Sequence, residues 1–142
     1  FVAGDAAILK KFLLYRTYHG CAMAPPVQTA SVAAWDDEAH VLDNRNQYRE
    51  KFAACTPPIA AVLGTGMPDA SFYLWARTPV ADTDFARGLL EQYNVIVLPG
   101  SFLAREADGV NPGAGFVRIA LVAPLADCLD AANRISQFAK QL

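Results

Sequence analysis

The 142-residue sequence predicts an α+β fold, a small two-layer sandwich with helices packed on one face of a short three-stranded sheet. Two observations support this prediction. Hydrophobic residues make up 54% of the chain and charged residues only 18%, which is enough apolar surface for one folded domain. The apolar residues follow a helical repeat in the first half, and in the second half short apolar runs alternate with helical repeats.

The first half of the chain contains signals for three helices. Asp5 is placed to cap the first helix, at about residues 5–18, and Gly20 to end it. The pair Pro25-Pro26 loses no hydrogen bond at the start of a helix and therefore begins the second one. The apolar residues 1–3, which precede these helices, predict a short strand that has no partner in this chain, as if it belonged to a larger sheet.

The third helix is predicted after Asp36-Asp37, which interrupts the second helix and can cap the next. Its apolar residues recur at the spacing of one helical face. Proline removes a backbone donor and crowds the preceding turn, so Thr56-Pro57-Pro58 is expected to break or kink this helix before a last turn that reaches Leu63.

The second half alternates strands with helices. Short apolar or aromatic runs bounded by glycine or proline predict the strands, and apolar stripes that follow capping residues predict the helices. The strands are expected at residues 71–77, 95–98 and 116–122, and the helices from Asp82 or Thr83 to Asn94 and from Pro124 onward. The glycine- and proline-rich segment 99–115 has no period, which makes it a candidate functional loop.

Composition argues against two classes of partner. Lys and Arg number 12 against 14 Asp and Glu, a net charge of −2 without the basic excess that nucleic-acid binding demands. No run approaches the roughly 18 apolar residues of a membrane helix. We therefore expect a soluble protein that binds neither nucleic acid nor membrane.

Metal binding is not expected either. The cysteines Cys21, Cys55 and Cys128 lie far apart, and His19 and His40 have no carboxylate or thiol at a ligand spacing. Free cysteine is commonly a core residue, so we expect buried thiols in a reducing cytosol.

Arg118 is a single charge inside an apolar strand pattern. Alternation places it on one face with Phe116 and Ala120, and places Val117 and Ile119 on the other. The pattern leaves two interpretations open. Arg118 is either an arginine at an exposed sheet edge or beside a stray carboxylate, or an anion-binding residue whose planar guanidinium holds a carboxylate through two hydrogen bonds.

Three motifs in residues 97–121 carry a resemblance to a known family. Pro99-Gly100-Ser101-Phe102, the glycine-bearing segment 111–115 and Arg118-Ile119-Ala120 follow one another in the order seen in the C-terminal part of fold-type I pyridoxal-phosphate aminotransferases. FVAGDAAILKKF resembles the stretch after that family's cofactor-binding lysine, and APPVQTASVAAWDDEAHV resembles its approach to the small domain. Within the family, residues 101–121 are most similar to the N-succinyldiaminopimelate aminotransferases of bacterial lysine biosynthesis.

The resemblance implies a domain organisation. Residues 1–24 would be a remnant of the large-domain edge with its linking helix, and residues 25–142 the C-terminal small domain. The chain begins in mid-pattern at Phe1, which agrees with the expectation that it is a piece of a longer protein.

The resemblance also implies roles for four residues. In the family, the arginine that matches Arg118 binds the substrate α-carboxylate, and the phenylalanine that matches Phe102 lies near the substrate. Arg105 is a candidate for a second carboxylate, although a solvated loop arginine is the alternative. Residues 18–24, with Met23, resemble the stretch that reaches the neighbouring active site in the family's homodimers.

The family's catalytic lysine has no match here. None of Lys10, Lys11, Lys51 and Lys140 lies in the S-K-x-x-x-x-x-G-x-R-x-G pattern that the family uses. The resemblance therefore implies a cytoplasmic, pyridoxal 5'-phosphate-dependent transaminase as the full-length parent, and a chain that is inactive by itself and contains no catalytic residue. The alternative from another class is a free-standing α+β module that binds a small carboxylate, or regulates, through its 99–115 loop.

Overall fold

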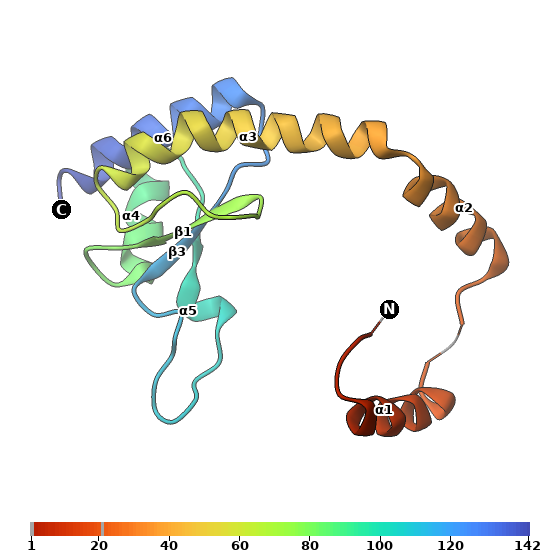
Figure 1. The fold of residues 1–142 in the computed structure, drawn as a ribbon. Helices are drawn as coiled ribbons and strands as arrows, with labels where there is room; N and C mark the ends of the chain where they lie inside the picture. The colour runs from red at the N-terminus through yellow and green to blue at the C-terminus, as the bar shows by residue number, and fades with distance from the viewer. Residues whose placement is uncertain (1, 21) are drawn as a thin grey trace. The chain divides into compact units, whose positions relative to one another are not determined.

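A computed structural model describes residues 2–20 and 22–142, and Figure 1 shows its helices and strands. The chain divides into two compact units, Phe1–Val41 and Leu42–Leu142. The division lies near the start of the third helix.

The first unit holds α1 (Ala6–Tyr18) and α2 (Pro25–Asp36), as predicted. The Asp5 carboxylate caps α1, because it accepts hydrogen bonds from the backbone N–H groups of Ala7 and Ile8 at 2.9 and 3.0 Å. Neither helix contains a buried residue. Val2 and Ala3 pair with no strand among the described residues, and Phe1 lies outside the described part, so the strand predicted at residues 1–3 stays a prediction.

The third helix, α3 (Glu38–Ala60), continues through Pro57 and Pro58, so the predicted break is wrong, while the alternative of a kink stays a prediction. Its last turns are held by packing, since one face of this part of the helix is buried. The carbonyl of Pro58 accepts the Ser136 hydroxyl at 2.6 Å, and that of Pro57 accepts the N–H of Ala61 at 3.1 Å. Burial and these bonds offset the two donors that the prolines remove.

The sheet has the order β1-β3-β2, and both pairings are antiparallel. Its strands are β1 (Tyr73–Arg77), β2 (Leu98–Pro99) and β3 (Phe116–Ala120). The strand predicted at 95–98 is shorter and later than expected, because only Leu98 and Pro99 face β3 and proline cannot donate to a ladder. Within the 99–115 loop lies α5 (Gly100–Leu103), a short helix that was not predicted.

One face of this sheet carries exposed or half-buried side chains, and helices of the second unit cover the other face. The C-terminal half of α3 packs there with α4 (Asp82–Tyr93) and α6 (Leu125–Ala139), as Figure 1 shows. The covered face presents Leu74, Ala76, Val117 and Ile119, all buried. The predicted α+β sandwich and the predicted alternation along β3 are therefore confirmed.

Two of the three cysteines lie in this core. Cys55 and Cys128 are free and buried, as predicted, whereas Cys21 lies outside the described residues. Burial, together with the neighbouring Cys128, raises the pKa of the Cys55 thiol above its ordinary value. Such a thiol stays protonated and unreactive, which fits a packing role.

Candidate functional site

The uncovered face of the sheet gathers aromatic and cationic side chains. Alternation along β1 and β3 directs five of them to this face, here called the open sheet face: Tyr73, Trp75, Arg77, Phe116 and Arg118. All five are exposed or half-buried. An aromatic surface with two arginines on rigid strands is suited to binding an anion that carries an apolar part.

Arg118 lies at the centre of the sheet. Its strand, β3, is the middle one, so the interpretation of Arg118 as an edge arginine is wrong. Its guanidinium carbon lies 5.6 Å from the centre of the Tyr73 ring, and its Nε atom is buried without a hydrogen-bond partner. In the part of the chain that the structure describes, no carboxylate pairs with Arg118. A buried, unpaired donor on a guanidinium is costly unless a ligand satisfies it.

Trp75 and Phe116 stack beside Arg118. Their ring centres are 5.7 Å apart and their planes differ by 17°. The guanidinium carbon of Arg77 lies 4.8 Å from the centre of the Phe116 ring. Trp75 faces Arg118 across the strands, and Arg77 faces Phe116, so the two arginines occupy one diagonal of a square and the stacked rings the other.

Asp82 holds both ends of the 99–115 loop. This residue, only 5% exposed at the start of α4, accepts hydrogen bonds from the backbone N–H groups of Ser101 at 2.8 Å and Gly115 at 3.4 Å. Burial raises the pKa of Asp82, but these hydrogen bonds lower it by more, and it lies below its ordinary value. The charged carboxylate therefore ties α5 and the start of β3 to the first turn of α4.

The loop is closed a second time through Asn111. The Asn111 amide donates to the Ser101 carbonyl at 3.0 Å and accepts from the N–H of Gly113 at 2.9 Å. Gly100 and Gly113 approach each other so closely that a methyl group on Gly100 would clash with the carbonyl of Gly113 and reach Trp75 at 2.9 Å. These contacts fix the loop against the open sheet face.

The other predicted site residues are all exposed. Phe102 in α5 is 71% exposed and lines an open apolar groove of about 320 Å³ with Leu90 and Ile96. Arg105 lies just beyond α5 and has no ion pair within the described ranges. Met23 is 56% exposed and belongs to the first unit. The roles predicted for all three remain predictions.

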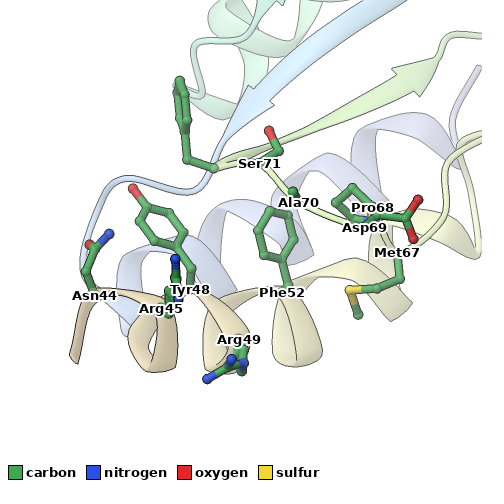
Figure 2. Close-up of a pocket in the computed structure, with 11 residues that line it drawn as sticks. Asn44, Arg45, Tyr48, Arg49, Phe52, Met67, Pro68, Asp69, Ala70 and Ser71 are labelled. Atoms are coloured by element: carbon green, nitrogen blue, oxygen red, sulfur yellow. The ribbon is translucent and has the colours of Figure 1, made fainter. Parts of the chain in front are cut away.

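Another groove lies elsewhere in the second unit. It measures about 890 Å³ and opens between α3 and the segment 67–72, with Tyr48 and Phe52 of α3 turned toward that segment in Figure 2. None of the predicted site residues lines it. The open sheet face is the better candidate site, because it holds Arg118, whose buried Nε has no hydrogen-bond partner among the described residues.

The lysines of this chain do not form a cofactor site. Lys10, Lys11 and Lys140 are exposed on helices or at a helix end, while Lys51 lies 5.1 Å from the Tyr48 ring centre and 3.4 Å from the carbonyl of Val122. None belongs to the open sheet face, so these residues do not fit the lysine attachment that pyridoxal phosphate requires. Across residues 2–20 and 22–142, no three histidine, cysteine or acidic side chains cluster as metal ligands.

The family model of aminotransferase class I and II matches residues 1–135. The chain belongs to the class I and II aminotransferases. The family resemblance predicted from the sequence is therefore confirmed, and this family depends on pyridoxal 5'-phosphate.

Individual aminotransferases are similar over most of the chain. An aminotransferase from Neisseria meningitidis is 56% identical, with a TM-score of 0.82, and the match covers 95% of this chain and 35% of that one. A probable N-succinyldiaminopimelate aminotransferase from Thermus thermophilus is 36% identical, with a TM-score of 0.60, over 72% of this chain and 27% of that one. A probable aminotransferase of Mycobacterium tuberculosis is 37% identical over 124 residues, 87% of this chain and 28% of the relative. The chain thus spans about a third or less of the aminotransferases that it matches.

Sequence reasoning missed the surroundings of Arg118 in this aminotransferase chain. Trp75 and Arg77 were placed in a predicted strand but not in a site, because their approach to Phe116 depends on the pairing of β1 with β3. A signal was present, since the alternation in SFYLWAR puts Tyr73, Trp75 and Arg77 on one face.

No helix in the described part of the chain is long and apolar enough to cross a membrane.

Proposed function

We propose that the full-length parent of this chain is a pyridoxal-phosphate-dependent aminotransferase of lysine biosynthesis. It transfers an amino group between an amino acid, N-succinyl-diaminopimelate or glutamate, and a 2-oxo acid. Residues 25–142 form its C-terminal small domain, and residues 1–24 belong to the edge of the large domain. The similarity to a probable N-succinyldiaminopimelate aminotransferase supports the choice of substrate.

Arg118 carries this proposal. Its guanidinium lies on the central strand, beside an aromatic ring, with a buried Nε that no atom of the described residues satisfies. A substrate α-carboxylate would satisfy it and form two parallel hydrogen bonds, which orient the amino acid. Both the amino acid and the 2-oxo acid carry a carboxylate beside the reacting carbon, so one arginine serves both.

The cofactor chemistry belongs to other parts of the parent. When bound, pyridoxal phosphate stores the electrons of the bond that breaks at the substrate α-carbon. This chain contributes substrate binding and orientation to that reaction. We place the parent in the cytoplasm as a homodimer, with Met23 reaching the partner's site.

Replacing Arg118 in the full-length parent tests the proposal. Arg118→Lys keeps the charge but loses the planar pair of hydrogen bonds, each worth about 1.5–3 kcal/mol. We expect kcat/KM to fall by roughly one to two orders of magnitude, and by more in Arg118→Ala. Both half-reactions should slow, because each substrate carries the carboxylate, while the absorbance of the bound cofactor should not change.

Two results would contradict this assignment. One is a kcat/KM of Arg118→Lys that equals that of the wild type in both half-reactions. The other is carboxylate binding by residues 1–142 with no transaminase activity in the parent, which would favour the free-standing module. Arg87→Gln is the matched control, since Arg87 lies exposed on α4 and pairs with Asp84 at 3.4 Å.

A further inference from the structure

We propose that Arg77 binds the second carboxylate of a dicarboxylic amino acid whose α-carboxylate is held by Arg118. The open sheet face would then select substrates in which a methylene chain separates two carboxylates. This inference rests on the proposed function, because it takes Arg118 as the α-carboxylate site.

The pairing of β1 with β3 sets the spacing of the two arginines. Arg118 faces Trp75 and Arg77 faces Phe116, so Arg77 and Arg118 are diagonal neighbours on the same face. Such neighbours lie about 7–8 Å apart at their Cα atoms. Arg118 lies against Tyr73, whereas Arg77 lies against Phe116. In this proposal, a flexible chain between the two carboxylates spans the separation of the two guanidinium groups.

Within the described residues, the guanidinium of Arg77 contacts the Phe116 ring, and no ion pair neutralises its charge. No carboxylate pairs with Arg77 among the residues described here, and its side chain is exposed. Two other arginines of this unit are paired, Arg87 with Asp84 at 3.4 Å and Arg134 with Asp130 at 2.6 Å. The contact with the Phe116 ring restricts the Arg77 guanidinium, and the N–H groups of a guanidinium over a ring can still donate to a carboxylate.

The stacked rings between the arginines suit the middle of such a substrate. Trp75 and Phe116 offer apolar surface on the diagonal that separates Arg77 from Arg118. The close approach of Gly100 to Trp75 limits the movement of the indole ring. Methylene groups that cross this surface lose contact with water, while the carboxylates at either end keep charged partners.

Arg105 is the competing residue for the same role. It was predicted from the sequence as a second-carboxylate candidate, and it is exposed in the 99–115 loop. No aromatic ring stacks on Arg105 in the described part of the protein. Arg77 is better preorganised to bind a carboxylate, because its position on β1 and its contact with the Phe116 ring already restrict its side chain.

The test compares donors that carry a second carboxylate with alanine, which carries one, in the full-length holoenzyme; glutamate has two carboxylates and N-succinyl-diaminopimelate has three. For Arg77→Gln we expect kcat/KM to fall 10- to 100-fold with N-succinyl-diaminopimelate and glutamate, and to change less than about twofold with alanine. Arg77→Lys should be intermediate with the dicarboxylates. Arg105→Gln and Arg87→Gln should leave the ratio of dicarboxylate to alanine kcat/KM unchanged, whereas Arg118→Lys should lower all three activities.

Binding supplies a measurement that does not need turnover. Titration calorimetry with glutarate, which has two carboxylates and no amino group, should show weaker binding to Arg77→Gln than to the wild type, with no such difference for butyrate. Three outcomes would each overturn the role of Arg77 and leave the proposed function standing. Arg77→Gln could lose as much kcat/KM with alanine as with the dicarboxylates, or could bind glutarate as the wild type does. Alternatively, Arg105→Gln could lose kcat/KM with the dicarboxylates alone. Unchanged activity in Arg118→Lys would overturn both. Should Arg77→Gln fail to fold, the Arg77→Lys comparison decides.

Discussion

Asp82 shows how one carboxylate organises the surroundings of the site. It belongs to no predicted site, yet it is buried and holds Ser101 and Gly115, which are 14 positions apart in the chain. Its position in the first turn of α4 adds a favourable interaction with the helix dipole. The placement of the loop therefore depends on the charge of a residue outside the open sheet face.

Replacing Asp82 by Asn should destabilise the chain in a pH-dependent way. The variant loses the charged acceptor, so we expect the free energy of unfolding at pH 7 to fall by about 1–3 kcal/mol. Urea titrations followed by tryptophan fluorescence measure it.

The sign of the pH effect follows from the lowered pKa of Asp82. A carboxyl whose pKa is lower in the folded state stabilises the protein fully above its unfolded value, ordinarily 3.8, and loses this stabilisation as pH falls through the folded value. The difference between wild type and Asp82→Asn should therefore shrink below about pH 4. A difference that stays constant down to pH 2 would show that Asp82 acts through shape rather than charge.

At the scale of elements, the helix boundaries were predictable where a local signal exists. Asp5 accepts the capping bonds expected of it, and Asn94 ends α4 in the left-handed conformation, with φ at 52°. The course of α3 through Pro57 and Pro58 was not predictable, because burial against α6 is a non-local term. The short β2 depends likewise on which residues of β3 remain to be paired.

The same distinction applies to the site. Arg118 could be singled out from the sequence, since one charge interrupts an apolar strand. That its strand is the central one, and that Arg77 lies diagonal to it, follows only from the order β1-β3-β2 and the register of β1. Local patterns identify residues, while strand pairing decides their neighbours.

The contact between α5 and the loop end should tolerate no added methyl group at Gly100. In Gly100→Ala the new Cβ would meet the backbone of Gly113 and Phe116, neither of which can move independently. We expect a loss of about 1–3 kcal/mol in the free energy of unfolding, typical of overpacking. Gly66→Ala is the control, because no atom lies within 4 Å of its Cβ position, and it should differ from the wild type by less than about 0.5 kcal/mol. Equal unfolding midpoints for the two variants would refute the close packing of Gly100.

At the scale of the whole chain, the two units differ in how much they bury. The core lies entirely in residues 52–138, whereas α1 and α2 contain no buried residue, and Trp35 is 78% exposed. Among the described residues, the hydrophobic core therefore belongs to the second unit.

Residues 1–142 by themselves should have no transaminase activity. Their four lysines lie outside the open sheet face, and an exposed lysine does not replace one that is positioned against the substrate. We expect no lysine-linked adduct after incubation with pyridoxal phosphate at stoichiometric concentration and reduction with borohydride, as measured by intact mass. The full-length parent is the positive control. An adduct on one specific lysine, accompanied by turnover, would contradict the assignment of the cofactor chemistry to other parts of the parent.

The double closure of the 99–115 loop has a consequence for how its length can vary. Hydrogen bonds of Asp82 and Asn111 hold the two ends of the loop together. The turn at Asp108 and Gly109 is therefore the tip of a loop that is already closed at its base. The entropic cost of closing such a loop grows only with the logarithm of its length. Doubling the length therefore costs about 0.6 kcal/mol. Insertions at this tip would therefore leave the strand register unchanged, and the tip is a place where related chains can gain or lose residues without moving Arg118.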